Sequence, residues 1–135
     1  PERTTYTLLE AGRLAVEEWV WAELPQIERP SDFRVALSEA HNLERDEVIA
    51  LLDQRRALLV ASVDEHHAGL ADSAERGTPE QFLVELQRQS ALLDAELAWQ
   101  DALHARLADR SLAWGVAEIP EHITSKHRLA KEAHA

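Results

Sequence analysis

The chain has 135 residues, 45% of them apolar, and a formal net charge of −11 at pH 7, which together suit one globular domain. This acidic balance excludes tight binding of nucleic acid by these residues alone, because a phosphate backbone is bound by Lys and Arg side chains that neutralise it. No stretch approaches the roughly 20 apolar residues of a membrane span, no cysteine is present and no targeting signal is visible, so we expect a cytoplasmic protein without a membrane role.

The first residues have the pattern of a strand that leads into a helix. Residues 4–8 are β-branched or aromatic, which predicts a strand. Thr7 and Glu10 have the spacing of a capping box, and a helix is predicted over residues 8–23, ended by Pro25. Nothing else in the chain predicts a strand that would pair with this one. We therefore expect its partner strand to precede Pro1.

Three further helices follow, separated by clear stop and start signals. Ser31 is a predicted N-cap for a helix that extends to about residue 42, and the next helix covers residues 44–75 without an internal proline. Gly77, Thr78 and Pro79 then predict a helix end, a new N-cap and a first helical position. The last helix covers residues 79–109 and has leucines near a 3,4 spacing that resembles a coiled-coil seam.

These elements predict an all-α fold of four helices, dominated by a long antiparallel hairpin of the third and fourth. Residues 1–8 form the strand remnant, residues 9–110 the helical domain, and residues 111–135 a polar tail. The hairpin carries apolar residues on more than one stripe, and two short helices cannot cover them all. A second copy of the chain is the simplest cover, so we expect a homodimer. The predicted interface residues are Leu86, Leu92, Leu93, Leu97, Trp99 and Leu103.

The sequence offers no group of residues with the pattern of a catalytic or cofactor site. His66 and His67 are the densest pair of candidate metal ligands, but neighbouring residues of a helix point in different directions and a zinc site needs three or four convergent ligands. Phosphate-binding glycine loops and strained nucleophile turns are absent from the sequence. We therefore expect neither enzymatic activity nor a metal or cofactor.

The tryptophans are the most informative side chains. Trp19 and Trp99 stand on predicted helices in a chain that has only two Phe and one Tyr. Such rings are most often buried in a core or a subunit interface, because they remove a large apolar area from water. The alternative is that Trp19 and Trp99 line a pocket for a flat, apolar ligand.

Several segments resemble PadR-type transcriptional regulators. Residues 3–13 read RTTYTLLEAGR, close to the family's Tyr-x-Leu-Thr-x-x-Gly pattern at the end of the winged helix, although Leu9 stands where the family has Thr. Further similar segments follow in the same order at residues 33–37, 47–59 and 92–99, so the resemblance covers about residues 3–108. It implies that these residues are the end of the wing and the C-terminal helical domain.

The resemblance also implies a function. PadR-type regulators are dimers that read duplex DNA through an N-terminal winged helix, which is absent from this chain, and some respond to small aromatic effectors. Only Arg3, Thr4 and Thr5 would lie on the wing, where they would contact phosphate. The leading hypothesis is a dimerisation and effector-sensing domain of such a regulator. The alternative is a stand-alone helical adaptor that binds a partner helix through its apolar stripe.

Overall fold

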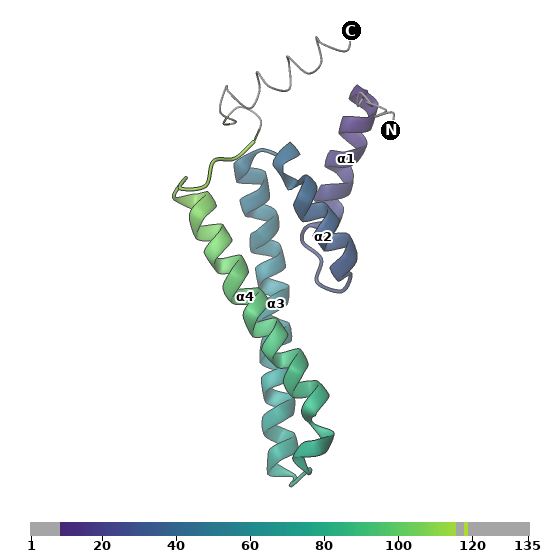
Figure 1. Ribbon diagram of the computed structural model, residues 1–135, viewed down its shortest axis with the longest axis vertical. Helices are drawn as coiled ribbons and strands as arrows, with labels where there is room; N and C mark the ends of the chain where they lie inside the picture. The colour runs from purple at the N-terminus through teal and green to yellow at the C-terminus, as the bar shows by residue number, and fades with distance from the viewer. Residues whose placement is uncertain (1–8, 116–117, 119–135) are drawn as a thin grey trace, which may run out of the picture.

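The computed structural model describes residues 9–115 and residue 118, and this part of the chain is all-helical (Figure 1). It contains the four predicted α-helices and, within the described ranges, no strand. The predicted strand remnant at residues 1–8 lies outside the described residues, as does most of the predicted polar tail. The helices are α1 (Glu10–Glu23), α2 (Pro30–Glu39), α3 (Arg45–Glu75) and α4 (Val84–Ala108), with short 3-10 turns at Ala40–Asn42 and Glu80–Phe82.

The two short helices begin at different residues from those predicted. Helix α1 begins at Glu10, with Leu9 at the N-cap position and no side-chain hydrogen bond there. The helix thus begins two residues later than predicted, and Thr7, the predicted cap, lies outside the described residues. Helix α2 begins at Pro30 instead of after Ser31, because proline at the first helical position has its backbone angle preset and needs no N–H partner.

Helices α3 and α4 form the predicted long antiparallel hairpin, which extends well beyond the two short helices (Figure 1). Glu44 and Glu47 form a reciprocal capping box at the start of α3. Gly77 has φ of 71° after the end of this helix, as expected for a glycine that reverses the chain. Pro79 has ψ of 134° and precedes the 3-10 turn, so it does not begin the fourth helix as predicted.

Three polar side-chain pairs, one Arg–Asp ion pair and two His–Asp contacts, join the two long helices along one exposed side. They are Asp53–His104, Arg56–Asp101 and His67–Asp94, with N–O distances of 3.0, 2.7 and 3.0 Å. Higher residue numbers on α3 pair with lower numbers on α4, as an antiparallel register requires. Exposed pairs of this kind each contribute at most about 1 kcal/mol, so the register depends mainly on apolar packing.

The core lies where the two short helices meet the hairpin, at the start of α3 and the end of α4. Val20 and Leu24 from the end of α1 pack with Leu52 of α3 and Leu107 of α4, and all four are fully buried. Leu112 and Trp114, which belong to the predicted polar tail, also pack against this cluster. Within the described residues, none of the helices is long and apolar enough to cross a membrane.

Candidate docking groove

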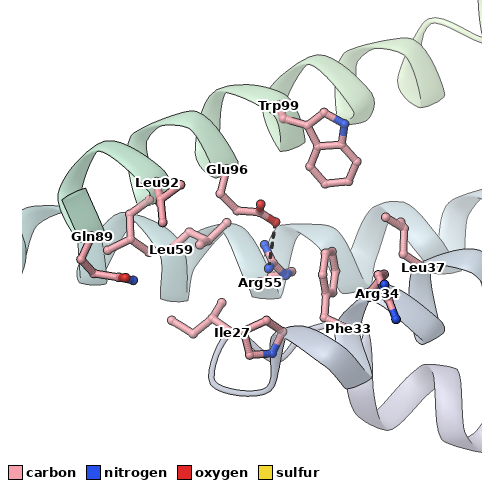
Figure 2. Close-up of a pocket in the computed structure, with 12 residues that line it drawn as sticks. Ile27, Phe33, Arg34, Leu37, Arg55, Leu59, Gln89, Leu92, Glu96 and Trp99 are labelled. Atoms are coloured by element: carbon pink, nitrogen blue, oxygen red, sulfur yellow. Dashed lines mark ion pairs between the residues drawn. The ribbon is translucent and has the colours of Figure 1, made fainter. Parts of the chain in front are cut away.

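An open groove lies between α2, the loop before it, and the α3–α4 hairpin (Figure 2). It has a free volume of about 530 Å³, which is within the usual range for ligand pockets. We call it the docking groove. Its lining residues are Ile27, Pro30, Phe33, Arg34, Leu37, Arg55, Leu59, Gln89, Leu92, Leu93, Glu96 and Trp99.

Arg55 holds the floor of the docking groove together. Its side chain on α3 is only 5% exposed, yet it reaches all the elements around it. The guanidinium pairs with Glu96 of α4 at 3.0 Å, as Figure 2 shows, and donates a hydrogen bond to the Gln26 carbonyl of the α1–α2 loop at 3.2 Å. It also stacks over the Phe33 ring of α2, with its central carbon 3.6 Å from the ring centre.

Gln100 completes this buried polar network. Its side-chain oxygen accepts a hydrogen bond from Arg55 at 3.0 Å, and its amide nitrogen donates one to the Leu52 carbonyl at 2.8 Å. Burial lowers the pKa of the Arg55 guanidinium, and the Glu96 carboxylate opposes this shift. Since the donors and acceptors satisfy one another, the network fixes the position of α2 and its loop against the hairpin.

The walls of the docking groove are apolar and unusually open to solvent. Trp99 is 42% exposed and Leu92 is 48% exposed, although both are large apolar residues on a well-formed helix. Trp99 meets Phe33 edge to face, with ring centres 6.5 Å apart. Such a contiguous apolar surface is typical of a binding or docking site.

The structure places the predicted interface residues at different depths. Leu92, Leu93 and Trp99 line the docking groove, whereas Leu86, Leu97 and Leu103 are half-buried elsewhere on α4. Leu103 packs against the main core.

The remaining predicted site residues do not meet at the docking groove. Trp19 is half-buried against the main core and is not part of the groove lining, so the two tryptophans suggested for ligand binding do not share one pocket. Arg3, Thr4 and Thr5 lie outside the described residues. His66 and His67 bond separately, to the Ser62 carbonyl and to Asp94.

A second cavity, of about 490 Å³, lies at the start of α3. Its main feature is Arg45, which is 8% exposed and donates hydrogen bonds to the carbonyls of Leu107 and Leu112. The same guanidinium binds both carboxylate oxygens of Glu118, at 2.9 and 2.8 Å. The Trp114 amide and this guanidinium hold the pKa of Glu118 below its usual value. Arg45 therefore fastens the segment after α4 to the start of α3.

Comparison with known proteins gives no relative for this chain: no family model, curated protein or solved structure matches it.

Proposed function

We propose that this chain is the C-terminal dimerisation and effector-sensing domain of a PadR-like, DNA-binding transcriptional regulator. The observation that carries the proposal is the docking groove, where Leu92 and Trp99 expose apolar surface on a long helical hairpin. Exposed apolar surface of this kind is typical of an interaction site, and a second copy of the chain would remove it from water. The all-α hairpin agrees with the fold that the resemblance implies.

The proposal assigns DNA binding to a winged helix on the N-terminal side of α1. A net charge of −11 keeps the surface of this domain away from phosphate, which leaves the DNA contact to a separate, basic part. Because such a regulator acts where the chromosome is, the proposal includes a cytoplasmic location.

Dimerisation predicts a particle of twice 15.2 kDa in light scattering coupled to size-exclusion chromatography. We expect Leu92→Asp to weaken the dimer at least tenfold, because it places an unpaired charge in the apolar interface. Leu58→Asp is the matched control, since Leu58 is 44% exposed on α3 and does not line the docking groove. A native chain that remains monomeric at high concentration would contradict the proposal.

The docking groove also supports the second part of the proposal, sensing of a small aromatic effector. The docking groove contains the exposed ring of Trp99, on which a planar aromatic ring would stack, and the Phe33 ring lies beside it. We expect planar aromatic compounds to quench tryptophan fluorescence, and Trp99→Phe to remove most of this response. Trp19→Phe is the control that should retain it, because Trp19 is half-buried against the main core and does not line the docking groove. If Trp99→Phe kept the full fluorescence response, the effector site would not be in the docking groove.

A stand-alone adaptor would use the same docking groove for the apolar face of a partner helix. The coding sequence upstream of Pro1 distinguishes the two functions. A helix-turn-helix pattern there supports the regulator, and a stop codon supports the adaptor.

A further inference from the structure

Helix α1 carries a second apolar surface that nothing in the described part of the chain covers. Leu14 is 48% exposed and Trp21 is 44% exposed. These two residues are seven positions apart and Glu18 lies between them, so all three side chains share one side of the helix. We call Leu14, Glu18 and Trp21 the outer face of α1. The opposite side of this helix supplies Val20 to the main core.

The outer face of α1 and the docking groove have opposite curvature. The first is a convex helix surface with two large apolar side chains, and the second is a concave, mainly apolar surface. A helix face of this kind is what an apolar groove of this kind accepts. Each surface would bury what the other leaves exposed.

Their charges also match. The docking groove has Arg34 exposed on α2, and the outer face of α1 has Glu18 exposed between its apolar residues. Within the described ranges, neither Arg34 nor Glu18 makes an ion pair. Each surface therefore combines exposed apolar side chains with one charge that has no partner within the described residues, and these two charges have opposite signs.

We infer that α1 of a second copy lies in the docking groove, with Leu14 and Trp21 against Leu92 and Trp99, and Glu18 beside Arg34. This inference rests on the proposed dimer and names the surfaces that form it. Under two-fold symmetry the contact occurs twice, because each chain gives its α1 and receives the α1 of the other. The groove of each chain is then completed by residues of its partner.

A charge exchange tests the pairing. Glu18→Arg and Arg34→Glu should each weaken the dimer about tenfold to a hundredfold in sedimentation equilibrium, because each places two like charges together twice per dimer. The double variant should recover to within about threefold of the native dissociation constant, because it restores opposite charges. Both positions are exposed, so the folded state should be retained, as circular dichroism would verify.

Glu75→Arg is the matched control for Glu18→Arg. It changes the net charge by the same amount, but it lies at the far end of α3, away from the docking groove. Its dimer should be as tight as the native one. If the dimer of the double variant dissociates as readily as those of the single variants, the inference is overturned, although the proposed dimerisation still stands. A monomeric native chain would overturn both.

Cysteine pairing gives an independent measurement, because the native chain has no cysteine to interfere. A Leu14→Cys chain mixed with a Leu92→Cys chain should form a disulfide-linked heterodimer on mild oxidation, since a disulfide requires Cα atoms within about 7 Å. Glu75→Cys in place of Leu14→Cys should not form one. Equal cross-linking in both mixtures, or none in either, would contradict the placement of α1.

Discussion

Replacing Arg55 with Met is expected to lower the free energy of unfolding by about 3 kcal/mol, because it removes one partner from a buried polar network. Arg55 is 4% exposed, and methionine would cover the Phe33 ring without donating any hydrogen bond. The Gln26 carbonyl and the Gln100 side-chain oxygen would lose their donor, and Glu96 would lose its cation. Urea denaturation at matched protein concentration measures the change.

The neighbouring arginine is a matched control for this experiment. Arg56 pairs with Asp101 at 2.7 Å, but its side chain is 48% exposed, so Arg56→Met should cost less than about 1 kcal/mol. Arg55→Lys should retain a charge beside Glu96 but lose the planar fork, and it should fall between native and Arg55→Met. Equal stabilities for Arg55→Met and Arg56→Met would show that the network does not hold the fold together.

The long elements of the fold could be predicted from the sequence, since their signals repeat over many turns. The third helix was predicted over residues 44–75 and is Arg45–Glu75. The ends of the shorter elements were less predictable, because several residues compete for each cap. Pro30 competes with Ser31 for the start of α2, and the 3-10 turn Glu80–Phe82 separates Pro79 from the start of α4.

The docking groove could be predicted only in part. Leu92, Leu93 and Trp99 were predicted to be interface residues from the excess of apolar positions on α4, and they line the groove. The polar floor was not predicted, although a signal for it exists. Arg55 lies three residues after Leu52 and four before Leu59, so it shares the buried face of α3. Gln100 interrupts the leucine pattern of α4 in the same way.

The contacts between Arg55 and Gln100 could not be predicted from the sequence, and the reason is physical. An arginine on an apolar face can extend its charge to solvent along the flexible stem, and only the positions of its neighbours decide whether it does. Here Phe33 of α2 covers the guanidinium, and Glu96 and Gln100 of α4 meet it from the other side. These contacts join residues that are distant in the sequence, and no local pattern records them.

Replacing Leu52 with Ala should lower the free energy of unfolding by about 3 kcal/mol, because the substitution leaves a cavity in a close-packed region. Leu52 is fully buried in the cluster that joins α1, α3 and α4. Its carbonyl still accepts the hydrogen bond from Gln100, so the experiment isolates side-chain packing from the polar network. Leu58→Ala is the matched control on the same helix, because Leu58 is 44% exposed and should cost less than about 1 kcal/mol. Similar losses for both variants in urea denaturation would mean that the core does not lie at the junction of the short helices and the hairpin.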